Sequence, residues 1–175
     1  NMNGGIPKDI KKFTHTIEFN NVENIKKVFK KYNLAAVMLE PIAAYLPDQK
    51  FLKTLKNFCK KNKTVLIFDE VCTGFRVSLG GAQKILKVKP NLSTFGKAMG
   101  NGFPISALVG EQKIMKNFDK VFYSGTFGGE TLSLEACNQT IKFLKKNRSI
   151  QKNIKKGEYL IYNFNKLSKK YNLQK

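Results

Sequence analysis

Residues 64–70 read Thr-Val-Leu-Ile-Phe-Asp-Glu, a run of four apolar residues that leads directly into two carboxylates. An apolar run without alternation is typical of a strand that is covered on both faces, as in the parallel sheets of α/β domains. In such sheets, ligands bind in a crevice beyond the carboxyl ends of the strands. Asp69 stands at such an end, and we therefore expect it to face a ligand crevice.

A second unit of the same kind follows along the chain. Residues 92–95 predict a short strand, and Lys97 comes just behind it in a glycine-rich loop. Two neighbouring units would thus bring one acid, Asp69, and one amine, Lys97, to the same edge of the sheet. From the spacing alone, a buried ion pair or two solvated loop residues explain this pattern at least as readily as a functional pair.

The remaining segments alternate between strand-like and helix-like patterns, which is the rhythm of a parallel α/β sheet. We expect strands at 34–39, 64–69, 92–95, 105–109 and 121–123, an edge strand at 13–19, and helices at 22–32, 48–61, 82–88, 111–118 and from 149 onward. The glycine-rich loop at 124–131 is expected to open a further helix, with Leu134, Cys137, Ile141 and Leu144 on its inner face. Asn20 or Asn21 is suited to cap the first of these helices. The predicted fold class is α/β, a three-layer α/β/α arrangement around a mostly parallel sheet.

The chain is strongly basic, with 32 basic and 12 acidic residues and a net charge of +20. Such a charge is one sign of a nucleic-acid-binding module, which we keep as the alternative from another class. However, only Arg76 and Arg148 are arginines, and the lysines are scattered as doublets over polar faces rather than gathered in one patch with aromatics. Base and phosphate recognition favours arginine, so we expect no nucleic-acid partner.

The cysteines and the ends of the chain bear on its location. Cys59, Cys72 and Cys137 have no metal-type spacing, so no metal site is predicted, and they fit reduced thiols in a cytoplasmic protein. No apolar run approaches the length of a membrane span, and no signal peptide is visible. The chain begins with Asn and stops within a helix-like pattern, so we expect it to be an excerpt of a longer protein.

Two phosphate-binding motifs can be ruled out around Lys97. In a phosphate-loop motif, position 91 would be glycine and position 98 a hydroxyl residue, whereas this chain has Asn and Ala. The glycines at 96, 100 and 102 do not have dinucleotide-binding spacing either. What remains is a lysine among small residues, where a planar cofactor could approach the backbone.

Four blocks of the sequence, in this order, resemble the class III aminotransferases, which are pyridoxal-phosphate enzymes of fold type I. The blocks are Leu-Glu-Pro at 39–41, Ile-Phe-Asp-Glu-Val-Cys-Thr-Gly-Phe-Arg at 67–76, Thr-Phe-Gly-Lys-Ala-Met-Gly-Asn-Gly-Phe-Pro at 94–104 and Ser-Gly-Thr at 124–126. The branch containing glutamate-1-semialdehyde aminomutase is the most similar. The resemblance implies transfer of an amino group between a small-molecule donor and a carbonyl acceptor, or its intramolecular aminomutase variant.

The resemblance also implies roles for individual residues. Asp69 would bind the pyridine nitrogen of the cofactor and keep it protonated, so that the ring can withdraw electrons. Val71 would pack on one face of the ring. Lys97 would be the Schiff-base lysine that also shuttles the proton, which requires a neutral amine and hence a depressed pKa beside the cationic ring.

Other implied features concern the subunit interface and the domains. Gly125 and Thr126 would reach across a homodimer to the partner's cofactor phosphate, although Thr126 or Thr131 could instead cap its own helix. Tyr45 stands where relatives place an Asn or Gln near the phenolic oxygen, and could donate the same hydrogen bond. We expect residues 1–147 to form most of the cofactor-binding domain, without its N-terminal portion, and residues 148–175 to begin the small domain. Arg76 could face a substrate carboxylate or stabilise its own turn.

Overall fold

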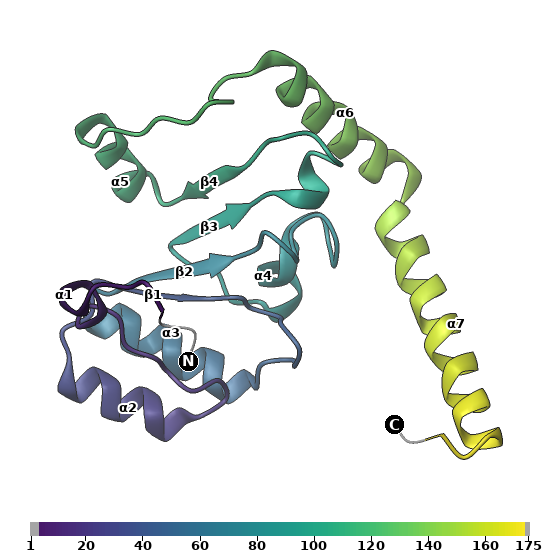
Figure 1. Ribbon diagram of the computed structural model, residues 1–175, viewed down its shortest axis with the longest axis horizontal. Helices are drawn as coiled ribbons and strands as arrows, with labels where there is room; N and C mark the ends of the chain where they lie inside the picture. Colours follow the sequence, from purple (N-terminus) through teal and green to yellow (C-terminus); the bar gives the residue numbers. More distant parts are fainter. Residues whose placement is uncertain (1–3, 174–175) are drawn as a thin grey trace.

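The computed structural model describes residues 4–173, and in it four strands and nine helical segments form an α/β fold (Figure 1). The elements are α1 (Lys8–Lys11), α2 (Val22–Lys31), β1 (Ala36–Leu39), α3 (Gln49–Lys61), β2 (Val65–Asp69), α4 (Gly81–Leu86), β3 (Leu92–Phe95), the 3₁₀ turn η1 (Lys97–Met99), β4 (Ala107–Gly110), α5 (Gln112–Met115), the 3₁₀ turn η2 (Lys116–Lys120), α6 (Thr131–Asn147) and α7 (Ser149–Lys170). The strands at 92–95 and 65–69 and the helix at 49–61 lie where the sequence predicts them.

The sheet has the order β1-β2-β3-β4. β1 pairs with β2 and β2 with β3 in parallel, whereas β4 runs antiparallel to β3. The mostly parallel α/β fold predicted from the sequence is therefore confirmed. Because β2 and β3 are parallel neighbours, the residues that follow them emerge at the same edge of the sheet.

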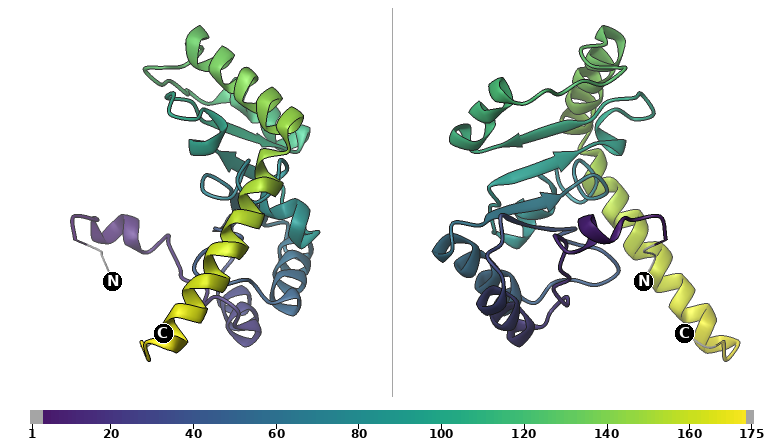
Figure 2. Two further views of the ribbon diagram at one scale, coloured as in Figure 1. Left: turned by 90° about the vertical axis from the view of Figure 1, so that its right-hand side faces the viewer. Right: turned by 60° about the vertical axis from the view of Figure 1, so that its left-hand side comes forward.

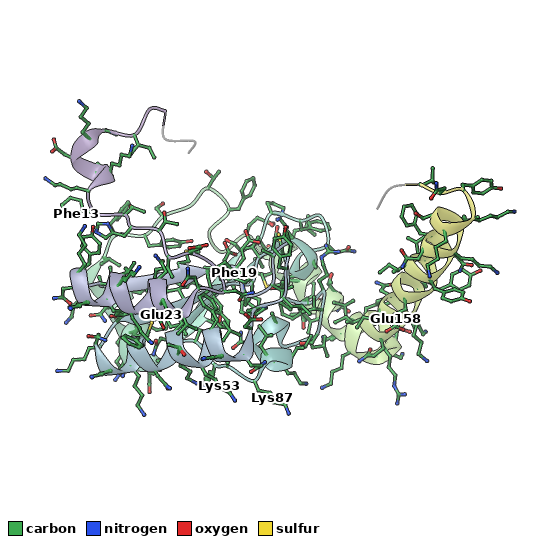
Figure 3. The ribbon with its side chains drawn as sticks, turned by 90° about the horizontal axis from the view of Figure 1, so that it is seen from below. Phe13, Phe19, Glu23, Lys53, Lys87 and Glu158 are labelled. Carbon is green, nitrogen blue, oxygen red and sulfur yellow. The ribbon has the colours of Figure 1, made fainter. Side chains whose placement is uncertain are left out.

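The core lies between the sheet and helices α2, α3 and α4. It is built from Ile25 and Phe29 on α2, Phe51, Leu52, Leu55 and Cys59 on α3, Leu66 and Phe68 on β2, and Ala82, Leu86 and Val88 at α4. Helix α2 begins where predicted, because the side chain of Asn21 accepts a hydrogen bond from the Asn24 backbone N–H at 2.9 Å. Lys53 and Lys87 point outward from the fold, as expected for amphipathic elements (Figure 3).

The prediction that the strand at 64–69 is covered on both faces is not met within residues 4–173. Leu66 and Phe68 are buried, whereas Val65, Ile67 and Asp69 between them are only half-buried. The apolar character of both faces made the strand appear fully covered, but these helices cover one face. The half-buried face is the one on which Asp69 lies.

Two predicted strands are wrong. Residues 13–19 form no strand; instead His15 stacks on Tyr32 with ring centroids 3.6 Å apart, and Ile17 and Phe19 pack against the core. The alternation in this segment thus reflects packing against helices rather than strand pairing. Residues 121–123 are also irregular and exposed, with Phe122 at 96% of its full exposure.

Helices α6 and α7 meet at Arg148, whose φ of 51° is left-handed and breaks the helical path. Beyond this break α7 runs away from the sheet (Figure 2). Its apolar residues Leu160 and Phe164 are 69% and 62% exposed. The break coincides with the predicted domain boundary, which stays a prediction; residues 1–3 and 174–175 of the two predicted domains lie outside the described residues. No helix within residues 4–173 has both the length and the apolar character that a membrane crossing needs.

Candidate active site

The site is built at the carboxyl end of β2, where Asp69 pairs in register with Thr94 of β3. One oxygen of the carboxylate, Oδ1, accepts hydrogen bonds from the Val71 backbone N–H at 3.0 Å and from the Thr94 hydroxyl at 3.1 Å. The other oxygen, Oδ2, accepts none from any residue between 4 and 173. The carboxylate is therefore held in place by one oxygen, while the other is available to a donor from a ligand.

A buried carboxylate fixes the backbone just behind Asp69. Glu70 is fully buried, and its carboxylate accepts hydrogen bonds from the Thr73 hydroxyl and from the backbone N–H groups of Ala82 at 2.7 Å and Gln83 at 2.8 Å. Its own N–H donates to the Thr94 carbonyl at 2.9 Å. This network ties the turn after β2 to β3 and to the start of α4, and so sets the positions of the residues that follow Asp69.

Lys97 is the first residue of η1, directly after Gly96, and its φ of 43° is left-handed. Its amine donates a hydrogen bond to the Cys72 sulfur, with Nζ and Sγ 2.6 Å apart. This hydrogen bond is the main reason that the pKa of Lys97 is raised above 10.5, with smaller contributions from the charges of Cys72, Glu40 and Asp69. The side chains of the chain itself thus favour the ammonium form. The depressed pKa, which was predicted for an amine beside a cationic ring, stays a prediction.

Val71 completes this group. Its side chain lies over Gly96, because a Cβ on that glycine would be 3.6 Å from Cγ1 of Val71, an ordinary van der Waals contact. Asp69, Val71 and Lys97 are therefore gathered at one edge of the sheet, as the sequence predicts. The arrangement offers a fixed anion, an apolar surface and an amine at the same edge of the sheet.

Three other predicted site residues are not brought to this group. Tyr45 is 75% exposed in the irregular segment after β1, and its hydroxyl has no hydrogen-bond partner among residues 4–173. Gly125 and Thr126 lie in the exposed segment before α6. Neither Thr126 nor Thr131 caps that helix, because the Glu130 carboxylate accepts from the Leu132 and Ser133 N–H groups, both at 2.7 Å.

Cys72 is the site residue that sequence reasoning missed. The sequence indicates only that it is one of three reduced thiols, yet its sulfur is in contact with the amine of Lys97. Its place three residues after Asp69, inside the turn that leaves the strand end, is the signal that could have indicated it.

Arg76 lies apart from this group. It lines a cavity between the turn after β2 and the α6–α7 junction, together with Phe75, Ala98 and Asn101. Asp69 and Lys97 do not line this cavity, although Ala98 follows Lys97 directly. Phe75 is fixed by an edge-to-face contact with Phe95, with ring centroids 5.7 Å apart.

A parallel sheet with an acid and an amine at one edge is found in many enzymes. Comparison with known proteins identifies the protein family. The family model described as Aminotransferase class-III matches residues 6–175. The chain belongs to the class III aminotransferase family.

Individual relatives agree with this membership. The chain is 41% identical over 155 residues to glutamate-1-semialdehyde 2,1-aminomutase of Archaeoglobus fulgidus, covering 85% of this chain and 37% of the relative. It is 38% identical over 177 residues to the protein of the same name from Fusobacterium nucleatum, covering 97% of this chain and 41% of the relative. The chain thus spans about two fifths of the length of these curated relatives.

Solved structures show the same fold. The FumI protein of Sphingopyxis sp. MTA144, in its PLP internal aldimine form, superposes with a TM-score of 0.93 at 25% identity over 98% of this chain and 43% of its own. An omega-transaminase from Sphaerobacter thermophilus superposes with a TM-score of 0.77 at 29% identity over 81% of this chain and 35% of its own.

Proposed function

We propose that the protein to which this chain belongs is a pyridoxal-phosphate-dependent aminotransferase, which moves an amino group between a small-molecule donor and a carbonyl acceptor. The observation that carries the proposal is the position of Asp69 and Lys97 at the carboxyl ends of the parallel neighbours β2 and β3, with Oδ2 of the acid left without a partner among residues 4–173. The family membership and the relatives' names support the same activity.

The residues at this edge fit the cofactor. The free Oδ2 of Asp69 would accept a hydrogen bond from the protonated ring nitrogen, while Val71 N–H and the Thr94 hydroxyl donate to Oδ1 and keep the carboxylate from turning. Val71, lying on Gly96, would offer its methyl groups to one ring face. Lys97 would hold the aldehyde carbon through its amine.

When bound, pyridoxal phosphate supplies an electron-withdrawing ring that stabilises negative charge at the substrate carbon. Asp69 serves this chemistry by keeping a proton on the ring nitrogen, because a carboxylate within hydrogen-bond reach favours the charged form. Lys97 takes a proton from the substrate carbon and returns one as general base and acid, for which its amine has to be neutral. The Cys72 sulfur accepts a hydrogen bond from the same nitrogen and so orients it.

The second candidate is an aminomutase that moves the amine within one substrate. The names of the curated relatives favour it, since both compared relatives are glutamate-1-semialdehyde 2,1-aminomutases. An aminotransferase requires an amino donor and a separate carbonyl acceptor for sustained turnover, whereas an aminomutase turns over with its single substrate. Measuring turnover with and without an added keto acid separates the two.

The partners follow from the same proposal. A homodimer would let the exposed segment with Gly125 and Thr126 reach the partner's cofactor phosphate, and the exposed side chains of residues 121–123 supply apolar surface for such an interface.

The free thiols of Cys59, Cys72 and Cys137 support a cytoplasmic location. A nucleic-acid-binding module, the alternative, would instead bind DNA or RNA with a steep dependence on salt.

Borohydride reduction of the full-length protein, followed by peptide mapping, tests the proposal. Reduction fixes the cofactor to the amine that holds it, and we expect the pyridoxyl group on Lys97 alone. A pyridoxyl group on another lysine, or none on the chain, would refute the assignment. Salt-dependent retention on DNA without cofactor absorbance would favour the nucleic-acid alternative.

A further inference from the structure

The contact between Cys72 and Lys97 joins two nucleophiles that the amino-transfer chemistry does not require to touch. Their sulfur and nitrogen atoms are 2.6 Å apart, although the residues are 25 positions apart in the chain. Cys72 is half-buried and the Lys97 side chain is exposed, so small solutes can reach the pair. A thiol beside an amine has a covalent chemistry of its own when an oxidant is present.

Both residues are held on short, hydrogen-bonded segments. Cys72 lies inside a turn that is closed by the Gly74 N–H on the Glu70 carbonyl at 2.7 Å. Lys97 begins η1, where its carbonyl accepts from Gly100 N–H and Asn101 N–H, both at 3.1 Å. The contact therefore joins two ordered backbone segments and does not depend on a mobile loop.

The other two cysteines lie in different surroundings. Cys59 is buried, and burial raises the pKa of its thiol to about 12. Burial also raises the pKa of Cys137. Since the reactive form of a cysteine is the thiolate, both are poor nucleophiles. Within residues 4–173, only Cys72 has a hydrogen bond to a side-chain amine.

We infer that Cys72 and Lys97 form a redox modification site, at which a peroxide joins the two side chains through a covalent sulfur–nitrogen bond. The peroxide first transfers an oxygen atom to the Cys72 sulfur, which gives a sulfenic acid and, from hydrogen peroxide, one water. The lone pair of the neutral Lys97 nitrogen then attacks that sulfur. The sulfur–nitrogen bond forms as the sulfur–oxygen bond breaks, and the oxygen leaves as a second water with one proton from the amine.

The stoichiometry of this reaction determines the mass change of the protein and the reagent that reverses it. The sulfur is oxidised, the peroxide is reduced, and the protein loses two hydrogen atoms. Two equivalents of an added thiol restore both side chains and become a disulfide. Because the reaction consumes a free amine, it would inactivate the enzyme at the nitrogen that holds the cofactor. A bound cofactor should therefore protect the site, an expectation that rests on the proposed function.

Peptide mapping of the full-length protein after hydrogen peroxide treatment tests the inference. Trypsin releases Cys72 in peptide 64–76, and a modified Lys97 blocks cleavage, so that this residue falls in peptide 88–113. We expect the cofactor-free protein, treated at a pH high enough to deprotonate part of the Lys97 amine, to yield these two peptides as one species, lighter than their sum by two hydrogen atoms. Dithiothreitol should separate them, and loading with pyridoxal phosphate beforehand should suppress the joined species.

Variants make the result specific. Cys72→Ser should abolish the joined species, whereas Cys137→Ser should leave it unchanged. If peroxide instead carries Cys72 to the sulfinic acid while trypsin still cuts after Lys97, the inference is wrong. If the joined species forms equally with and without cofactor, the cross-link stands, and the role of Lys97 in holding the cofactor is the part that fails.

Discussion

The carboxylate of Glu70 lies directly against the backbone of Gly81, where a Cβ atom would overlap it. Gly81 also has a φ of +69°, which L side chains rarely adopt. The neighbouring Gly80 has a φ of −95°, and a Cβ there would meet only the flexible side chain of Lys84. The two adjacent glycines therefore have different reasons to be glycine.

We expect Gly81→Ala to lower the free energy of unfolding by about 3 kcal/mol, from the overlap and the backbone strain together. Gly80→Ala, the matched control, should change it by less than about 1 kcal/mol. Urea denaturation of the two variants measures the difference. Equal effects would mean that the Glu70 carboxylate does not constrain Gly81.

The contribution of the buried Glu70 carboxylate to stability can be tested directly. Glu70→Gln replaces one of the two acceptor oxygens with an NH2 group, which cannot accept a hydrogen bond. The side chain can then no longer accept from Thr73, Ala82 and Gln83 together, so the free energy of unfolding should fall by about 2–3 kcal/mol. Glu158→Gln on exposed α7 removes the same charge with a change within about 0.5 kcal/mol. Thermal melting of both variants distinguishes the loss of the network from the loss of charge, and similar melting temperatures would contradict the prediction.

Asn91, directly before β3, connects Leu66 of β2 with Glu111, directly after β4, and contributes to a pH dependence of stability. Its side chain accepts from the Leu66 N–H at 2.8 Å and donates to the Glu111 carboxylate at 2.7 Å. The hydrogen bond from the Asn91 amide to the Glu111 carboxylate is the main reason that the pKa of Glu111 lies below its ordinary value of 4.5, and the hydrogen bond from Lys113 is the second. A lowered carboxylate pKa stabilises the fold above the ordinary value, and the contribution is lost as the pH falls through the lowered one.

We therefore expect Asn91→Ala to reduce the acid-induced loss of stability below pH 4.5, because the variant has less of this contribution to lose. Urea denaturation of the wild type and the variant between neutral and acidic pH measures it. Glu158→Gln on exposed α7, which removes a carboxylate away from the sheet, serves as the control. Parallel stability curves for Asn91→Ala and the wild type would show that Asn91 has no such role.

Ser133 and Ser168 are both buried but differ in their hydrogen bonds. The Ser133 hydroxyl has no partner among residues 4–173, whereas that of Ser168 donates to the Leu173 carbonyl at 3.1 Å. Ser133→Ala should leave stability unchanged or raise it by up to about 1 kcal/mol, while Ser168→Ala should lower it by about 1 kcal/mol. Differential scanning calorimetry shows the sign of each change, and a marked loss in Ser133→Ala would reveal a partner for its hydroxyl.

Thr94 offers a test of the site that leaves Asp69 and Lys97 intact. Thr94→Val keeps the shape but removes the donor to Asp69 Oδ1, and should weaken cofactor binding by about tenfold or more, as for other residues that orient a ligating group. Thr94→Ser keeps the hydroxyl and should bind nearly as the wild type does. Cofactor titration followed by absorbance measures both, and unchanged binding in Thr94→Val would show that the hydroxyl does not position the acid.

Much of this fold could be predicted because local patterns and core packing agree. The apolar face of α3 and the Asn21 cap of α2 are readable from a few neighbouring residues. The edge strand predicted at residues 13–19 is wrong. His15, Ile17 and Phe19 alternate with polar residues as in a strand, but they pack on α2 and the core. Alternation records which side chains are covered, not whether a strand or a helix covers them.

The site was predictable only in part, for a related reason. Asp69 and Lys97 could be placed together because Asp69 ends one short strand and Lys97 follows its parallel neighbour. The contact of Cys72 with Lys97 depends on the register of that sheet and on the turn that Glu70 ties down, both of which involve residues far apart in the chain. The position of Tyr45 depends on an irregular segment, for which the sequence gives no periodic signal.

The backbone of Lys97 carries a last consequence. A left-handed φ costs a residue with a Cβ about 1 kcal/mol relative to glycine, so the chain keeps a lysine where its main chain would favour the smaller residue. On the proposed function, Lys97→Gly should lose amino transfer and have a higher free energy of unfolding than the wild type. At position 97, the residue required for the proposed amino transfer is therefore not the residue that would give the highest stability.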